Sequence, residues 1–238
     1  MPVASLKGAL FLLESNRESI HYLAMLWIVV IAIIVGAYLI GSVPSGYLAG
    51  RAKGVDLRVA GSGNIGATNA LRVLGKKWGY TVFAVDAFKG WLAVTLALVA
   101  GCHFMPEYAI PCGVLAAGFC VVGHNFPVWL GFKGGKGIAT SAGIMIGLFP
   151  IWVFLFGIAL WTVLFYVTRY VSIASIAAAI SLPTSSFVLM LLGQCDWLRV
   201  CIAGVLCLLA LWRHKPNIER LLAGTEKRFE KKRPEPQP

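Results

Sequence analysis

Long apolar runs alternate with short polar segments along most of this chain. The clearest runs cover residues 23–41, 78–100, 108–130, 171–192 and 197–212. As helices rising about 1.5 Å per residue, most of them are long enough to cross roughly 30 Å of hydrocarbon. The pattern therefore predicts an all-α integral membrane protein.

A further apolar run, residues 138–168, admits two interpretations. As one helix it would be about 46 Å long, and Pro150 would interrupt it in the middle. A break near Pro150 gives two helices instead, at 137–149 and 150–168. Only the two-helix reading puts most Lys and Arg residues on one side, as cytoplasmic loops require. We therefore predict seven transmembrane helices, with the N-terminus outside and the C-terminus in the cytoplasm.

The ends of the chain differ from the middle. Residues 1–24 hold only a short apolar patch, so we interpret them as an external or interfacial N-terminal extension. Residues 25–229 form a single helical membrane domain. Residues 230–238 are basic and rich in proline, a composition that predicts a disordered tail.

The composition supports this class. The chain is 58% hydrophobic and 13% charged, whereas soluble domains are nearer ~25% charged. The net charge of +11 is assigned to cytoplasmic loops facing lipid headgroups, so we predict no nucleic-acid partner. The six cysteines are scattered without a CxxC pair, which argues against a metal site. We predict no cofactor.

A loop rich in glycine and lysine stands out in this apolar chain. Glycine lets backbone N–H groups approach an anion closely, and lysines add positive charge beside them. The spacing differs from that of a nucleotide-binding P-loop. A flexible basic turn between two helices is the alternative. The candidate anion-binding residues are Lys133, Gly134, Gly135, Lys136 and Gly137.

A second loop, residues 61–69, has the same character. It carries neutral hydrogen-bonding side chains and is followed by Arg72, whose planar guanidinium suits phosphate. Ordinary turn chemistry is the alternative interpretation. The candidate residues are Ser62, Asn64, Thr68, Asn69 and Arg72.

Other polar residues lie within or beside the apolar runs. Asp86 and Lys89 are three apart, so they share a helix face and predict a structural ion pair. Ser175 lies one turn into its helix. His214 and Asn217 are also three apart and can face one cavity. On the predicted topology, the last three join both loops at the cytoplasmic face.

Cationic and neutral donors dominate this set, and carboxylates are sparse. Such a set suits a phosphorylated, lipidic substrate approached from the cytoplasm. Catalysis and transport both remain open at this point. A carrier of a phosphorylated small molecule would be expected to show inverted repeats and a midplane site, and no repeat is visible.

Several motifs resemble the bacterial acyl-phosphate:glycerol-3-phosphate acyltransferase family (PlsY), in matching order and spacing. They are GSVPSGYLAGR at 41–51, GSGNIGATNALR at 61–72, DxxKG at 86–90, GHNFPVWLGFKGGKGIAT at 123–140, SIASI at 172–176 and RHKPNIERLLAGTE at 213–226.

The resemblance implies an enzyme of the bacterial inner membrane whose active site faces the cytoplasm. It would transfer an acyl group from acyl phosphate to the 1-hydroxyl of sn-glycerol 3-phosphate, giving lysophosphatidic acid and phosphate. It implies direct transfer without a cofactor or a covalent acyl-enzyme. Its partners would be the two substrates, the lipid bilayer and the enzyme that makes acyl phosphate.

The resemblance also implies roles for particular residues. The expected phosphate-binding and catalytic residues are Ser62, Arg72, Lys136, Ser175 and His214, with Asn217 contacting the glycerol hydroxyl. Thr68 would line the site, and Gly134 to Gly137 would help hold glycerol 3-phosphate. The remaining motif positions expected to bind substrate are Ser42, Arg51 and Glu226.

Overall fold

The computed structural model describes residues 3–229, and their side chains from residue 20 on except that of residue 22. Across this range the regular elements are all helices, which confirms the all-α prediction. They are α1 (Val3–Ser42), α2 (Ser45–Arg51), α3 (Ala67–Leu74), α4 (Lys76–Phe104), η1 (Pro106–Tyr108), α5 (Ala109–Asn125), η2 (Val128–Leu130), α6 (Ile138–Leu148), α7 (Ile151–Thr168), α8 (Val171–Leu191), α9 (Trp197–Arg213) and α10 (Lys215–Leu222).

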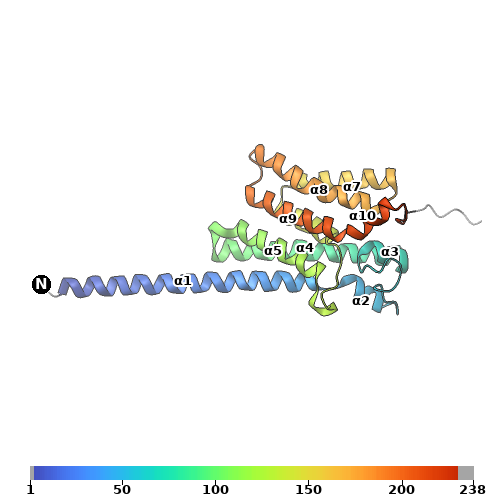
Figure 1. Ribbon diagram of the computed structural model, residues 1–238. Helices are drawn as coiled ribbons and strands as arrows, with labels where there is room; N and C mark the ends of the chain where they lie inside the picture. Colours follow the sequence, from blue (N-terminus) through green and yellow to red (C-terminus); the bar gives the residue numbers. More distant parts are fainter. Residues whose placement is uncertain (1–2, 230–238) are drawn as a thin grey trace, which may run out of the picture.

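The long helices form two layers that run in nearly the same direction (Figure 1). Helices α1, α4 and α5 pack against one another in the first layer, and α7, α8 and α9 form the second. Helix α6 packs mainly on α4 and also contacts α7 and α9, so it joins the layers. The short helices α2, α3 and α10 gather at the end opposite the N-terminus (Figure 1).

Five of the described helical segments are long and apolar enough to cross a membrane. A sixth is added if α9 and α10, which are bent by 54° relative to each other, count as one span. Helix α6 is shorter, with 11 residues. The long segments are Leu23–Arg51, Lys76–Phe104, Pro106–Leu130, Ile151–Thr168 and Val171–Leu191.

The predicted break at Pro150 is present, between the end of α6 and the start of α7. Both ends of α6 are tied to α9. Arg213 Nε donates to Gly135 O (2.9 Å) just before α6, and Arg199 Nε donates to Leu148 O (2.6 Å) at its end. Those arginines are separated by about 21 Å of helix at 1.5 Å per residue. With its entry loop, α6 therefore extends along most of α9 in the opposite direction.

Glycine allows helices of the first layer and α6 to pack backbone against backbone. A Cβ atom added at Gly143 of α6 would lie 1.8 Å from Ala87 O of α4. One added at Gly41 of α1 would lie 2.0 Å from Cys120 O of α5. Small residues at such contacts are typical of membrane helices, which gain stability from close packing rather than from water exclusion.

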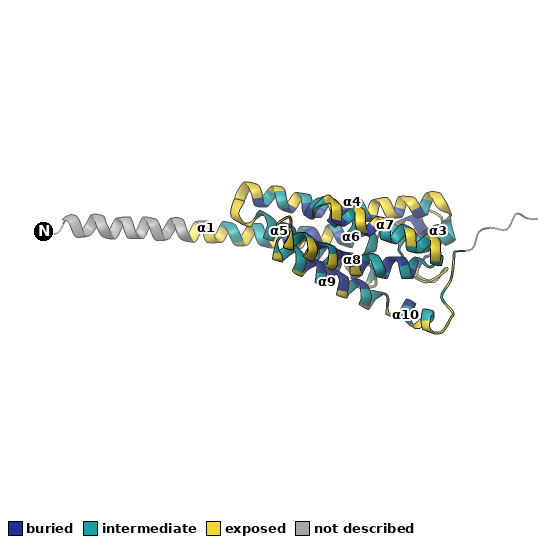
Figure 2. Ribbon diagram, turned by 90° about the horizontal axis from the view of Figure 1, so that it is seen from above, coloured by how far each residue is buried: buried dark blue, intermediate teal, exposed yellow. Residues whose placement is uncertain are grey.

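Burial follows the same arrangement. Dark blue, buried positions lie mainly where the helices face one another, and exposed positions face outward (Figure 2). Many exposed side chains are large and apolar, such as Trp27, Phe156 and Leu208, which are 61%, 54% and 67% exposed. An apolar exterior of this kind suits lipid rather than water.

Helix α1 continues without a break from Val3 to Ser42, 40 residues or about 60 Å. The boundary expected after residue 24 is therefore not marked by a change in backbone structure. The tail predicted at residues 230–238 lies outside the described residues.

The α4–α6 contact leads to a stability prediction. We expect Gly143→Ala to destabilise the fold by about 1–3 kcal/mol, because the added methyl group overlaps the α4 backbone. Thermal unfolding in detergent, followed by tryptophan fluorescence, measures the effect. Gly204→Ala on α9 is the matched control, since no atom lies within 4 Å of its Cβ position. Equal unfolding temperatures for both variants would contradict the proposed close packing.

Candidate functional site

Three separate segments meet in a polar cluster at the end of the bundle that carries α3 and α10. Lys136 Nζ, in the loop before α6, donates to Asn217 Oδ1 on α10. Asn217 Nδ2 donates to Glu226 Oε1 (2.7 Å), and Arg220 Nε donates to Glu226 Oε2 (2.7 Å). Of the predicted site residues, Lys136, Asn217 and Glu226 are thus brought into direct contact.

His214 joins this cluster from the turn between α9 and α10. Its side chain is buried, and Nδ1 lies 2.7 Å from Ala210 O, so Nδ1 carries the proton and Nε2 is the free acceptor. Burial, reinforced by the charge of Lys136, lowers the pKa of His214 to about 4. His214 is therefore neutral at physiological pH.

The charge balance of the cluster favours an anion. Burial lowers the pKa of Lys136 to about 8; Glu226 opposes this shift, whereas Arg213 and Arg72 add to it. Burial also raises the pKa of Glu226, but hydrogen bonds from Asn217 and Arg220 outweigh that effect and leave it lowered. One ionised carboxylate thus faces several cations, and a phosphate would relieve their mutual repulsion.

Arg72 reaches the cluster from α3. One Nη donates to Lys227 O (3.1 Å), and the guanidinium lies 4.8 Å from the centroid of the Phe229 ring. The C-terminal segment after α10 therefore holds this arginine in place. Thr68, on the first turn of α3, lines the apolar groove described below.

The glycine-rich loop is docked onto the end of α5. Gly134 N donates to Asn125 O (3.1 Å), and Gly135 N donates to His124 O (3.1 Å). Arg213 donates to both glycine carbonyls, at 2.6 Å and 2.9 Å. Gly134 and Gly135 therefore do not form the expected cradle of free N–H groups, because both amides are already bonded within the protein.

The glycines instead position Lys136 at the start of α6. A Cβ atom at Gly135 would lie 2.2 Å from His124 Nε2, so only glycine fits against that ring. Gly137 has a φ of 83°, in the left-handed region, where it precedes α6. The first-turn N–H groups of α6 lack helical partners and point toward this end.

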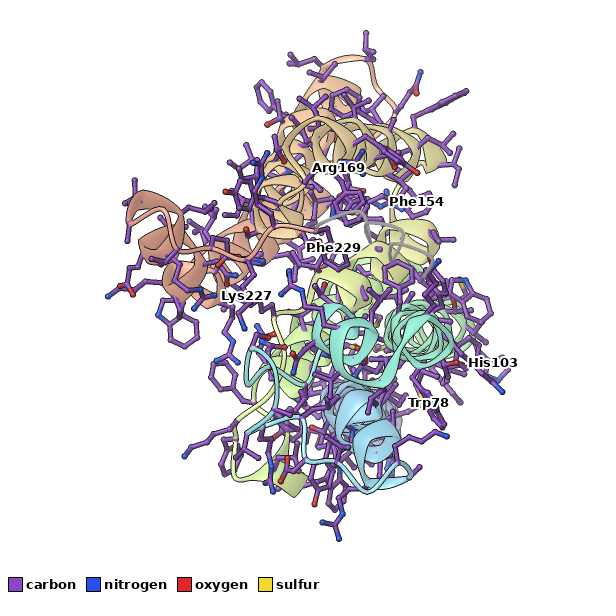
Figure 3. All side chains as sticks on the ribbon, turned by 90° about the vertical axis from the view of Figure 1, so that its right-hand side faces the viewer. Trp78, His103, Phe154, Arg169, Lys227 and Phe229 are labelled. Carbon is purple, nitrogen blue, oxygen red and sulfur yellow. The ribbon has the colours of Figure 1, made fainter. Side chains whose placement is uncertain are left out.

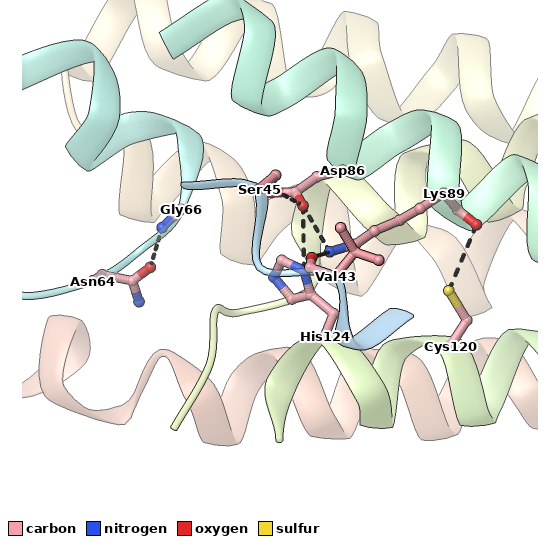
Figure 4. A network of polar contacts seen from close by, with 8 residues as sticks. All are labelled: Val43, Ser45, Asn64, Gly66, Asp86, Lys89, Cys120 and His124. Carbon is pink, nitrogen blue, oxygen red and sulfur yellow. Dashed lines mark hydrogen bonds and ion pairs between the residues drawn. The ribbon is translucent and has the colours of Figure 1, made fainter. Parts of the chain in front are cut away.

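A buried charged network joins α4 to the α1–α2 break and to His124 near the end of α5 (Figure 4). Asp86 and Lys89 on α4 form the predicted ion pair, with Nζ 2.8 Å from Oδ1. Ser45 Oγ donates to Asp86 (2.7 Å), and Lys89 Nζ donates to Val43 O (2.9 Å). His124 Nδ1 lies 3.6 Å from Asp86. The network ties the α1–α2 break and α4 to the end of α5 on which the loop rests.

The second polar loop is organised by Asn69. Its Oδ1 accepts from Ser62 N (2.8 Å), and its Nδ2 donates to Leu57 O (3.2 Å) and Ala60 O (2.9 Å). Asn64 Oδ1 accepts from the N–H group two residues later. Both asparagines thus shape the loop through their own hydrogen bonds. The substrate contact expected of them stays a prediction.

Several expected site residues lie apart from the cluster. Ser42 is fully buried at the end of α1, beside the Asp86 network. Arg51 is exposed and close enough to Asp56 to lower that residue's pKa, an effect secondary to the contacts from Arg58. Ser62 and Lys133 are both exposed.

An apolar groove of about 750 Å³ runs between the two layers, and one of its lining residues, Ala210, accepts the hydrogen bond from His214 of the polar cluster. Ser175 on α8 is buried beside it, and its Oγ accepts from Trp161 Nε1 (3.1 Å). Phe83 of α4 and Ile158 of α7 line the groove and are 42% and 40% exposed, so it opens sideways between these helices. Phe229 lines its polar end.

Comparisons with known proteins identify the family. A family model described as glycerol-3-phosphate acyltransferase matches residues 31–224. The chain belongs to the glycerol-3-phosphate acyltransferase family. Relatives with that name include one from Synechococcus sp. (strain CC9902), 47% identical over 82% of this chain and 92% of its own. Another, from Aquifex aeolicus (strain VF5), is 41% identical over 83% of this chain and 97% of its own.

Two solved structures of an integral membrane member of the family, PlsY, have the same fold. Its glycerol 3-phosphate form has a TM-score of 0.75 and 39% identity, covering 84% of this chain and 96% of its own. Its lysophosphatidic acid form has a TM-score of 0.73 and 38% identity, covering 84% and 95%. The family membership predicted from the motifs is thus confirmed.

Some residues of this family member's site were not predicted from the sequence. Arg213 holds the glycine loop, and its place directly before His214 in the last motif was an available signal. Trp161 contacts Ser175 from a different helix, and Phe229 stacks on Arg72 from far along the chain. No local pattern marks either aromatic residue, because tertiary packing alone brings them to the site.

The docking of the loop leads to a second prediction. We expect Arg213→Met to raise hydrogen exchange at the Gly134 and Gly135 amides by about 10–100-fold, because two charge-assisted hydrogen bonds are lost. Hydrogen exchange with mass spectrometry measures this. Lys215→Met, two residues away and exposed, is the control. Unchanged protection in the Arg213 variant would show that the α5 carbonyls hold the loop unaided.

Proposed function

We propose that this protein transfers an acyl group from acyl phosphate to the 1-hydroxyl of sn-glycerol 3-phosphate, producing lysophosphatidic acid and inorganic phosphate. The observation that carries the proposal is the link between an apolar groove and a basic polar cluster: Phe229 lines the groove and stacks on Arg72, and Ala210 lines the groove while its carbonyl oxygen accepts from His214. Phosphate groups suit the cluster, and a fatty acyl chain suits the groove. Both substrates can therefore meet where the cluster and the groove join.

The groove has a length suited to a lipid chain. Its lining along α7 runs from Arg169, just beyond the helix, to Phe154, which corresponds to about 22 Å of helix. One leaflet supplies about 15 Å of the roughly 30 Å hydrocarbon core. An acyl chain of ordinary membrane length can thus lie in the groove with its phosphate at the cluster.

The reaction requires little covalent chemistry from the protein, because acyl phosphate is already activated. The glycerol hydroxyl attacks the acyl carbonyl carbon, the new ester C–O bond forms, and the bond to phosphate breaks. Lys136 and Arg72 stabilise the negative charge that develops on the carbonyl oxygen and on the leaving phosphate. The hydroxyl proton passes to His214 Nε2 or to a phosphate oxygen.

The remaining residues have supporting roles in this proposal. Asn217, held between Lys136 and Glu226, is oriented to contact the glycerol hydroxyl. Ser175 and Thr68 lie beside the groove, where the acyl phosphate head would sit. Ser62 and Lys133 are exposed, one on each of the two polar loops, and would contact the substrate once it binds. The first-turn amides of α6 add donors for phosphate.

We further propose that the six long helices and the shorter α6 all cross the inner membrane of a bacterium, with the site facing the cytoplasm. The antiparallel ties between α6 and α9 support a full crossing by α6 and its entry loop. The gathering of Arg72, Lys136, Arg213 and the C-terminal segment at one end supports a cytoplasmic orientation. An enzyme that makes acyl phosphate would be the natural donor partner.

One assay tests the proposed function. Purified protein in detergent is incubated with palmitoyl phosphate and radiolabelled glycerol 3-phosphate, and radiolabelled lysophosphatidic acid is measured. We expect Lys136→Ala and Arg72→Ala to lower kcat/KM by about 10²–10³-fold, because each removes a cation from the transition state. A protein that binds glycerol 3-phosphate but forms no product would be a carrier, and the proposal would fail.

The lowered pKa of Lys136 predicts a pH dependence. Because only the ammonium form attracts phosphate, we expect kcat/KM for glycerol 3-phosphate to fall as the pH rises through about 8. Lys136→Arg should remove this fall, since a guanidinium stays charged. Lys77→Arg, an exposed residue at the start of α4, should leave it in place. A flat wild-type profile between pH 7 and 9 would exclude this role for Lys136.

A further inference from the structure

We propose that residues 225–229, here called the C-terminal strap, form part of the active site, with Phe229 as the residue that positions Arg72. This inference rests on the proposed function. The strap follows α10 and lies just beyond the residues matched by the family model, which end at 224. None of the expected site residues except Glu226 comes from it.

The strap makes two complementary contacts with Arg72. The Phe229 ring lies 4.8 Å from the guanidinium carbon and supplies an aromatic face for the cation. Lys227 O accepts a hydrogen bond from one Nη (3.1 Å). A guanidinium has five N–H donors in a rigid plane, so fixing one face and one edge still leaves others for a phosphate.

Both ends of the strap are anchored. At its start, Glu226 bonds to Asn217 and Arg220 of α10 (2.7 Å each). At its end, Phe229 N donates to Arg169 O (2.9 Å), in the turn between α7 and α8. The strap therefore bridges the α10 side of the polar cluster and the α7 side of the groove. An element held at two points can fix the position of a third group between them.

Phe229 also closes the polar end of the groove. Its ring lies 5.6 Å from that of Phe165 on α7, in an edge-to-face arrangement, and it lines the groove. Figure 3, which looks along the helices from this end, shows Phe229 between the α7–α9 layer and α3. Arg228 adds a hydrogen bond to Thr168 O (3.3 Å) beside it. Phe229 thus lines the groove and also stacks on Arg72.

Alternative roles for the strap predict different kinetics. If Phe229 only fills space, its loss would lower stability and would change kcat/KM by the same factor whether or not Arg72 is present. If Phe229 positions Arg72, its loss has consequences only while Arg72 is present. Coupling between these two residues therefore separates the two roles.

The test is a double-mutant cycle in the palmitoyl phosphate assay, with Phe229→Ala, Arg72→Ala and both together. We expect Phe229→Ala alone to lower kcat/KM for glycerol 3-phosphate about tenfold, the scale of a partly desolvated cation–π contact. In the Arg72→Ala background we expect a further change of less than about twofold. Phe229→Trp should retain activity, because indole offers a stronger aromatic face.

Equal losses in both backgrounds, or no loss from Phe229→Ala, would overturn the positioning role. Phe104→Ala, at the far end of α4, is the control for removing a phenylalanine away from the site. If Phe229→Ala unfolds, Phe229→Leu keeps the apolar volume without the aromatic face and should show the same loss. If the wild type forms no lysophosphatidic acid, the proposed function fails; calorimetric affinities for glycerol 3-phosphate in the same four proteins then test the strap.

Discussion

A buried ion pair is the constraint on which the rest of the structure depends. Asp86 and Lys89 lie among apolar helices, where an isolated charge would be very costly, so each must find partners. Those partners come from elsewhere: Ser45 and a carbonyl group at the α1–α2 break, and His124 at the end of α5. Satisfying two charges on α4 therefore fixes where three segments meet.

The candidate site is built on that platform. His124 supports Gly135, and Arg213 clamps the loop from the other side, so the Lys136 ammonium is presented by a rigid turn rather than by a flexible one. The stretch at residues 133–137 had two interpretations, an anion-binding loop and a flexible basic turn, and each is correct in part. The stretch is a turn between two helices, but hydrogen bonds order it. The amides of Gly134 and Gly135 donate to carbonyl groups of α5 rather than to an anion.

The sequence predicts the helices well and the contacts less well. Apolar runs and Pro150 place the membrane-spanning part of each long helix, because lipid-compatible length and helix breaking are local properties. They do not place the start of α1, which begins at Val3 rather than near residue 23. The motifs identify Lys136, Asn217 and Glu226 as site residues, and these do meet. The local roles of Asn64 and Asn69, the docking of Gly134 and the stacking of Phe229 on Arg72 could not be predicted. Each depends on which carbonyl or ring lies nearby after folding.

The sideways opening of the groove determines how the acyl donor would reach the site and which donor concentration would set the rate. A ligand with an acyl chain arrives by diffusion within one leaflet, so its effective concentration is a mole fraction among lipids, not a molarity in water. Glycerol 3-phosphate, by contrast, arrives from solution. The rate would thus depend on the surface concentration of the acyl donor and on the bulk concentration of glycerol 3-phosphate. Enlarging the membrane at constant donor content would dilute the donor among lipids and slow the reaction without any change in the protein.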